Sequence, residues 1–196
     1  PSGESLRAGE RLIASETTGN IVQVLPNGDL VDVFALTHIV SGGTGALEPL
    51  AHEIAMIRST DKGASWSDPM RVGVELTGQS PGGALDPYTG QPLRTGGLLP
   101  AITLDQRSGQ LYVAWQDARF SRTRQPGIAI ARSTDEGQTW SDPIRVNQTP
   151  GDASAFTPSI AVLADGTVGV SYYDLRNNSP TQDAILADAW LATCRA

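Results

Sequence analysis

Three segments of the chain share a pattern in which a turn glycine precedes alternating apolar residues. They are residues 27–34, 108–115 and 165–172, and in each an aromatic residue stands six positions after the glycine. Alternation with a period of two places apolar side chains on one face of an extended strand, and glycine supplies the positive φ of a tight turn. Each segment therefore predicts a β-strand that is entered through a tight turn.

Further apolar stretches flank these three strands and complete a repeating unit. The unit is strand, tight turn, strand, loop, strand, turn, strand, which predicts a four-stranded antiparallel meander. Meanders that repeat in this way are typical of the blades of a β-propeller. The flanking strands are expected at residues 21–25, 98–104 and 157–163 before the tight turns, at 53–58, 127–132 and 184–189 after the aromatics, and at 70–74 and 144–147 in the fourth position.

The turn before the fourth strand contains a stronger repeat. Residues 58–72 recur as residues 132–146, and eleven of the fifteen positions are identical. In the shared Ser-x-Asp-x-Gly-x-x-Trp, a short Asp side chain accepts hydrogen bonds from turn amides, Gly takes a positive φ and Trp buries its ring. We expect these residues to hold the turn, with direct calcium or ligand binding as the alternative. They are Ser59, Asp61, Gly63 and Trp66 in one copy and Ser133, Asp135, Gly137 and Trp140 in the other.

This motif resembles the Asp box, or BNR repeat, of the sialidase superfamily, and the resemblance extends over about 180 residues in blade architecture. It implies a sialidase-like β-propeller whose boxes lie between the third and fourth strands, on the face opposite the active site. It also implies a secreted or extracellular, glycan-directed protein related to glycoside hydrolases of the exo-sialidase type. We expect no signal peptide within these residues. The Arg-Ile-Pro motif of sialidases does not occur in this sequence, so the family's catalytic residues cannot be placed.

Charge and composition exclude several other functions. The chain has 14 Lys and Arg against 21 Asp and Glu, a formal net charge of -7, and no basic run that would bind nucleic acid. No apolar stretch approaches the roughly 20 residues that span a bilayer, so no membrane span is expected. The single cysteine, Cys194, excludes an intramolecular disulfide and a multi-cysteine zinc site. We expect neither a metal nor a cofactor.

Alternate connections of an antiparallel blade emerge at opposite ends of its strands. The end away from the boxes is expected to carry any site, because its loops are longer. There an Asp and an Arg follow the second strand in two units, as Asp117 with Arg119 and as Asp174 with Arg176. Two positions apart, they lie on one side of an extended segment, where Arg can pair with Asp or face an anionic ligand. We favour a structural pair, with ligand binding by Arg119 and Arg176 as the alternative.

Two functions of different class fit this pattern. A sialidase-like glycoside hydrolase needs a carboxylic acid near the leaving oxygen and a nucleophile opposite it, and Asp117, Asp174 and Tyr173 are the candidates. A non-catalytic propeller that binds a carbohydrate or a protein, or that assembles with copies of itself, is the alternative, and the missing arginine motif favours it. Convergence of Arg119 and Arg176 on one central pocket would separate the two hypotheses.

We expect residues 1–196 to form a single portion of a propeller. The expected blades are residues 19–74, 98–147 and 156–190, of which the third lacks a fourth strand. Residues 10–18 resemble the fourth strand of the second unit, so we expect them to complete a preceding or a partner blade. Closed propellers typically have four to eight blades. We therefore expect either that the chain is half of a larger six-bladed propeller or that two copies assemble.

Overall fold

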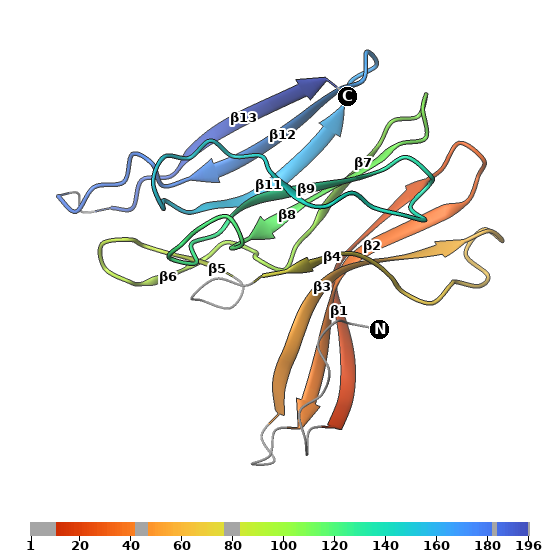
Figure 1. Ribbon diagram of the computed structural model, residues 1–196, viewed down its shortest axis with the longest axis horizontal. Coiled ribbons are helices and arrows are strands. Elements are labelled where there is room, and N and C mark those ends of the chain that lie inside the picture. Colours follow the sequence, from red (N-terminus) through yellow and green to blue (C-terminus); the bar gives the residue numbers. More distant parts are fainter. Residues whose placement is uncertain (1–10, 42–46, 77–82, 182–183, 196) are drawn as a thin grey trace.

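A computed structural model describes residues 11–41, 47–76, 83–181 and 184–195 (Figure 1). The described residues form thirteen β-strands and no helix, and hence contain no helix of the length and apolarity that a membrane crossing requires. Three larger antiparallel sheets lie side by side in chain order, and a two-stranded hairpin forms a separate, smaller sheet. The prediction of an all-β fold with about three antiparallel blades is therefore confirmed.

The first sheet has the strand order β1-β2-β3-β4 and is built from long strands. Its strands are β1 Arg11–Val24, β2 Leu30–Ser41, β3 Leu47–Ser59 and β4 Met70–Glu75. We expected residues 10–18 to belong to a different blade, but β1 pairs with β2 along its whole length. Gly19, with φ of +71°, sits in a bulge that absorbs the change of register and lets the strand continue. Residues 11–18 thus find their hydrogen-bond partners within the first sheet.

The second and third sheets follow with the orders β10-β9-β8-β7 and β11-β12-β13, and the hairpin β5-β6 precedes them in the chain. Among the described residues the third sheet has three strands. The bounds are β5 Gly83–Leu85, β6 Pro92–Arg94, β7 Ala101–Leu104, β8 Leu111–Asp117, β9 Gly127–Ser133, β10 Ile144–Arg145, β11 Ala155–Val162, β12 Thr167–Asp174 and β13 Asp188–Arg195.

Strand β8 lies at the centre of the packing, because all seven of its residues are buried. Val113 and Trp115 pack against the first sheet, whereas Tyr112 and Ala114 pack against the third. A strand that is covered on both faces has no polar side, which explains its nearly continuous apolar sequence. The two cores on either side of β8 hold the three sheets together.

The two boxes share the hydrogen bonds that their aspartates accept. In the first box the Asp61 carboxylate accepts bonds from the Ser65 hydroxyl and the Ser65 amide, at 2.6 and 2.8 Å. Thr139 bonds Asp135 in the same way in the second box, at 2.6 and 2.9 Å. These bonds, the hydroxyl bonds foremost, lower the pKa of Asp61 and of Asp135 to about 2. Each aspartate is thereby a fixed acceptor for its own turn.

The two box tryptophans differ, and neither is fully buried as expected: Trp140 is partly buried, and Trp66 is exposed. The second box packs back onto the first sheet: a Cβ at Gly137 would meet the Met56 side chain, and Trp140 packs against the core between these sheets. Trp66 belongs to the first sheet and is 39% exposed. No sheet precedes the first one among the described residues, so Trp66 lacks the neighbour that covers Trp140.

This difference predicts unequal costs for truncating the two rings. Trp140→Ala should lower the free energy of unfolding by about 2 to 4 kcal/mol, because it removes packed apolar surface and leaves a cavity beside the core. Trp66→Ala should cost less than about 1.5 kcal/mol, because the ring is already partly in water. Urea unfolding of both variants provides the measurement, and equal losses would contradict the packing described.

Candidate functional site

The strand ends of the three sheets define two opposite faces. The box face carries the tight turns at residues 25–29, 105–110 and 163–166 together with the two boxes. The loop face carries the ends of β4, β8 and β12 and the connections that leave them. In Figure 1 the tight turns point to the right, whereas the β5-β6 hairpin and the connection from β12 to β13 lie at the left. Asp117 and Asp174 end their strands on the loop face.

Asp117 is fully buried and ties the second sheet to the first. Its carboxylate accepts bonds from the Trp115 indole at 2.9 Å and from the Arg119 Nε and Nη2 at 2.9 and 2.8 Å. Arg119 also donates to the Val74 carbonyl at the end of β4. The Ala118 amide donates to the Leu76 carbonyl at 2.8 Å. The Asp-Arg pair therefore braces two neighbouring sheets where they meet at the loop face.

Asp174 repeats this arrangement in the third sheet. The Arg176 Nε and Nη2 donate to its carboxylate at 2.8 and 2.6 Å, and the Thr149 hydroxyl donates at 2.7 Å. Burial alone would raise the pKa of Asp174, but the bonds from Arg176 and Thr149 hold it below its usual value. The guanidinium lies 3.5 Å from the centre of the Trp190 ring. Arg176 is thus held by a carboxylate and an aromatic face at once.

The two arginines serve separate braces. Arg176 lines a cavity on the loop face, whereas the described cavities do not include Arg119. In both arginines the Nε and Nη2 groups donate to a buried carboxylate. Each arginine is thus paired with the aspartate two positions before it.

Glu75 is a further carboxyl on this face that sequence analysis missed. It ends β4, is 5% exposed, and its Oε2 has no hydrogen-bond partner among the residues that the structure describes. Burial, together with the nearby Asp117 charge, raises the pKa of Glu75 to about 9. His52 stands opposite it in the β3–β4 register, and the Thr37 hydroxyl lies 3.0 Å from the His52 Nδ1. Burial lowers the pKa of His52, so both groups are neutral at pH 7.

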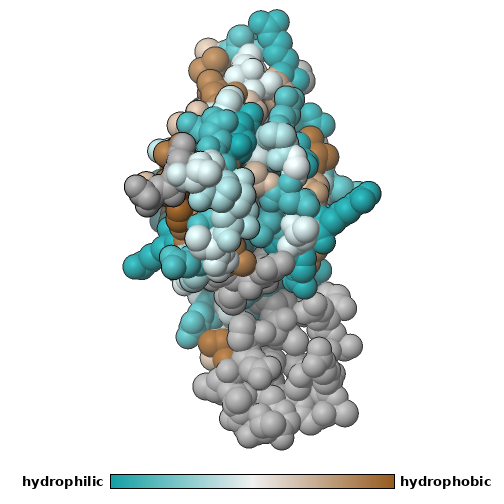
Figure 2. All heavy atoms as spheres, turned by 90° about the vertical axis from the view of Figure 1, so that its left-hand side faces the viewer, coloured by the Kyte–Doolittle hydropathy of each residue, from teal (hydrophilic) through white to brown (hydrophobic). Residues whose placement is uncertain are grey.

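A groove lies between the β5-β6 hairpin and the connection after β12. Two adjoining cavities of about 470 and 500 Å³ share Tyr88 and Asn178. Tyr88 is 52% exposed, and its hydroxyl donates to the Asn178 carbonyl at 3.3 Å. Figure 2 looks onto this side of the molecule, where most of the described surface is hydrophilic. We call it the hairpin groove, and its lining includes Asp86, Tyr88, Gln125, Asp152, Arg176 and Asn178.

Buried contacts fix the hairpin that forms one wall of this groove. Ala84 is fully buried and packs with Phe156 and Leu175 of the third sheet. Its amide donates to the Thr95 Oγ1 at 3.2 Å, and the Thr157 hydroxyl donates to the Thr95 carbonyl at 2.7 Å. The wall is therefore a packed element attached to β11 and to the residue that follows β12.

A short repeat in the sequence could have revealed this hairpin. Residues 85–91 read Leu-Asp-Pro-Tyr-Thr-Gly-Gln, and residues 104–110 read Leu-Asp-Gln-Arg-Ser-Gly-Gln. In both turns the aspartate amide donates to the carbonyl of the last Gln at 2.9 Å, and a hydroxyl three positions later donates to the aspartate carboxylate at 2.5 Å. The second copy is the tight turn between β7 and β8. The first copy presents Tyr88 where the second presents Arg107.

Tyr173, the third catalytic candidate, points away from Asp174. Neighbouring residues of a strand face opposite sides of the sheet. Tyr172 is buried against the second sheet, whereas Tyr173 is 47% exposed and stacks on Phe156 with 6.3 Å between ring centres. The structure therefore does not bring Tyr173 and the Asp174 carboxylate into one site.

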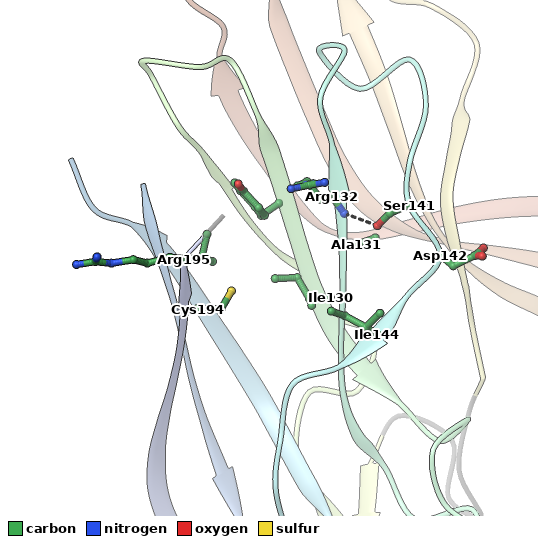
Figure 3. Close-up of a pocket in the computed structure, with 10 residues that line it drawn as sticks. Ile130, Ala131, Arg132, Ser141, Asp142, Ile144, Cys194 and Arg195 are labelled. Atoms are coloured by element: carbon green, nitrogen blue, oxygen red, sulfur yellow. Dashed lines mark hydrogen bonds between the residues drawn. The ribbon is translucent and has the colours of Figure 1, made fainter. Parts of the chain in front are cut away.

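A third hollow, of about 380 Å³, opens on the box face between the second and third sheets (Figure 3). Apolar side chains make up much of its lining, including Ile130, Ile144 and the exposed Cys194. Its polar contacts belong to the second box, where the Arg132 amide donates to the Ser141 hydroxyl at 3.0 Å. Saccharides need convergent polar groups, so the hairpin groove is the better candidate.

The Glu75 carboxyl predicts a specific dependence of stability on pH. Its pKa is raised in the folded chain, so its contribution to stability is largest at low pH and is lost as pH rises from about 4.5 toward 9. The slope from this group is at most about 1.4 kcal/mol per pH unit. Glu75→Gln should flatten the curve of unfolding free energy between pH 5 and 9 and stabilise the chain at pH 8. Urea unfolding at several pH values measures this, and parallel curves would exclude it.

The two braces predict that loss of either arginine destabilises the fold. Arg119→Ala or Arg176→Ala leaves a buried carboxylate without its partner, which should cost about 3 kcal/mol. Arg176→Lys should recover only part of the loss, because an ammonium group cannot bond both carboxylate oxygens in the same plane. Arg122→Ala, at an exposed position, is the control. A melting temperature unchanged from the native chain would show that the arginines do not brace these loops.

Comparison with known proteins places this geometry in a known fold. No family model and no curated protein sequence matches the chain. Among solved structures, a Hadza microbial sialidase matches over 95% of this chain with 17% identity and a TM-score of 0.55. The Penicillium chrysogenum α-L-arabinanase complexed with arabinobiose matches over 91% with 12% identity and a TM-score of 0.51. The GH93 α-L-arabinofuranosidase of Fusarium graminearum matches over 90% with 15% identity and a TM-score of 0.50.

The chain spans only part of each of these structures. The matches cover 35% of the sialidase, 62% of the arabinanase and 45% of the arabinofuranosidase. At this level of identity they define the architecture. The chain has the sialidase-like β-propeller fold.

Proposed function

We propose that this chain is the glycan-binding portion of a β-propeller related to glycoside hydrolases, with the saccharide held on the loop face. The names of the matched structures support a glycan ligand, because they include a sialidase, an arabinanase and an arabinofuranosidase. A secreted or extracellular location goes with this proposal, since glycans of other cells and of polymers lie outside the cell.

The observation that carries the proposal is the hairpin groove. A half-exposed Tyr88 ring lies among amide and carboxylate side chains in an open hollow of the loop face. A sugar ring combines an apolar face with polar hydroxyls at its edge, so an aromatic platform with polar neighbours suits it. The Asn178 contact and the packed hairpin hold this platform in place, which lowers the entropy lost on binding.

Hydrolysis of the exo-sialidase type is the finer hypothesis. It requires a proton donor and a nucleophile or base. Asp117 and Asp174 are paired with arginines, which suits neither to donate a proton. Glu75 ends β4 on the same face and keeps its proton at neutral pH, which makes it the candidate acid under this hypothesis. It does not line the hairpin groove, so this hypothesis places the reacting bond beyond the groove.

A non-catalytic, glycan-binding propeller is the second candidate function. It is favoured by the engagement of Arg119 and Arg176 with buried aspartates, because these are the arginines that a sialoside carboxylate would need. In this case the remainder of a larger propeller, or a second copy of the chain, completes the assembly without completing an active site.

Two assays test the proposal and separate its two forms. Isothermal titration with a panel of oligosaccharides should show binding, and Tyr88→Ala should weaken it at least tenfold while the melting temperature stays close to that of the native chain. Turnover of fluorogenic sialosides or arabinofuranosides, abolished by Glu75→Gln, would support the hydrolase form. Binding without turnover would support the non-catalytic form. A folded chain that binds no saccharide would refute the proposed function.

A further inference from the structure

The hairpin groove carries information about the charge of its ligand. Three charged side chains are found among its described lining residues, namely Asp86, Asp152 and Arg176. The described lining of the groove thus contains two carboxylates and one guanidinium. The net charge that a ligand meets in the groove depends on whether each of these groups keeps its charge. It also depends on whether the guanidinium can reach the ligand.

The two carboxylates differ in exposure, because Asp86 is 5% exposed whereas Asp152 is open to solvent. Bonds from the Thr89 hydroxyl, at 2.5 Å, and from the Tyr88 amide, at 3.1 Å, hold the pKa of Asp86 below its usual value. Asp86 is therefore ionised well below neutral pH. Asp152 lies at an exposed position and accepts a bond from the Ser121 hydroxyl at 3.1 Å. Among the described residues, these two carboxylates accept hydrogen bonds from Tyr88, Thr89, Asn178 and Ser121, none of which carries a positive charge.

The positive charge is already compensated. The Arg176 Nε and Nη2 donate to the Asp174 carboxylate, and the guanidinium plane is covered by Trp190. The bonds from Asp174, with a smaller opposing effect of burial, raise the pKa of Arg176. An anionic ligand that sought Arg176 would have to displace a buried carboxylate, which leaves that carboxylate unpaired at high cost.

Neutral hydrogen-bonding groups make up the rest of the polar lining. The Gln125 amide is oriented by the bond that its oxygen accepts from the Ser154 hydroxyl at 2.7 Å. The Asn178 amide is oriented by its bonds to Asp86 and from the Leu186 amide, at 3.1 and 3.2 Å. Amides and carboxylates together offer donors and acceptors to hydroxyl groups. Carboxylates are acceptors that suit sugar hydroxyls and repel another carboxylate.

We propose that the hairpin groove binds an uncharged saccharide and discriminates against sialylated or other anionic glycans. This inference rests on the proposed function and adds the class of its ligand. Tyr88 provides the platform for the sugar face, and Asp152 and Asn178 provide partners for its hydroxyls. Asp86 contributes its charge, because its two oxygens are already bonded by its own turn and by Asn178. Repulsion by the two carboxylates, which Arg176 does not offset, supplies the discrimination.

The test is a glycan array followed by titration of the native chain with arabinobiose, lactose and 3′-sialyllactose. The last two sugars form a matched pair that differs by the charged residue. Uncharged glycans should bind at least tenfold more tightly than their sialylated counterparts. Tyr88→Ala should weaken the binding of uncharged glycans at least tenfold, and Tyr88→Phe, which keeps the ring, should retain most of it. Asp152→Asn, which keeps the shape of the side chain and removes its charge, should reduce the preference for lactose over 3′-sialyllactose several-fold.

The possible failures are distinguishable. Sialylated glycans that bind as tightly as uncharged ones, with Tyr88→Ala still impairing both, would overturn this inference and leave the proposed function standing. Binding of uncharged glycans that is insensitive to Tyr88→Ala, in a variant with the native melting temperature, would overturn the assignment to this groove. A folded native chain that binds no glycan would overturn both the proposed function and this inference.

Discussion

The burial of Trp115 between the first and second sheets is the contact on which the rest of the structure depends. Its ring is fully buried, and Gly73 lies so close beneath it that a Cβ there would stand 3.0 Å from the ring. The glycine in β4 therefore lets the two sheets approach closely at this point. The indole NH then needs an acceptor, because a buried donor without one is costly. Asp117 provides it at 2.9 Å and in turn requires Arg119.

These linked contacts determine which side chains on each face stabilise the fold and which remain for a ligand. On the loop face, polar groups that satisfy buried atoms are committed to the fold, and this applies to both Asp-Arg pairs. Groups beyond the braces, on the β5-β6 hairpin and on the connection after β12, are free to differ from blade to blade. On the box face, Arg58 bonds Asp29 and Glu136 at 2.6 and 2.7 Å and so ties the first sheet to the second box. The Asp-Arg pairs that stabilise the fold thus recur in two sheets, whereas the hairpin that offers the candidate ligand contacts occurs once among the described residues.

The same distinction explains what the sequence could predict. Repeated features, such as the boxes and the turn glycines before β2, β8 and β12, indicated the sheets and their order because each copy supports the others. Trp66 shows the limit, since its burial depends on a neighbouring sheet that its own motif does not describe. Glu75 was missed because it has no counterpart in the other units and its raised pKa arises from burial. Tyr88 was missed as a site residue because its repeat, at residues 85–91, is short and lies in the long connection between β4 and β7.

The loop face is proposed to hold the ligand, and the box face to hold the fold together. A crystal structure of the chain soaked with the uncharged saccharide that it binds most tightly would locate the ligand. Density for the sugar is expected in the hairpin groove, with its ring against Tyr88 and its hydroxyls near Asn178 and Asp152. Density in the hollow beside Ile130 and Cys194, on the box face, would contradict this proposal.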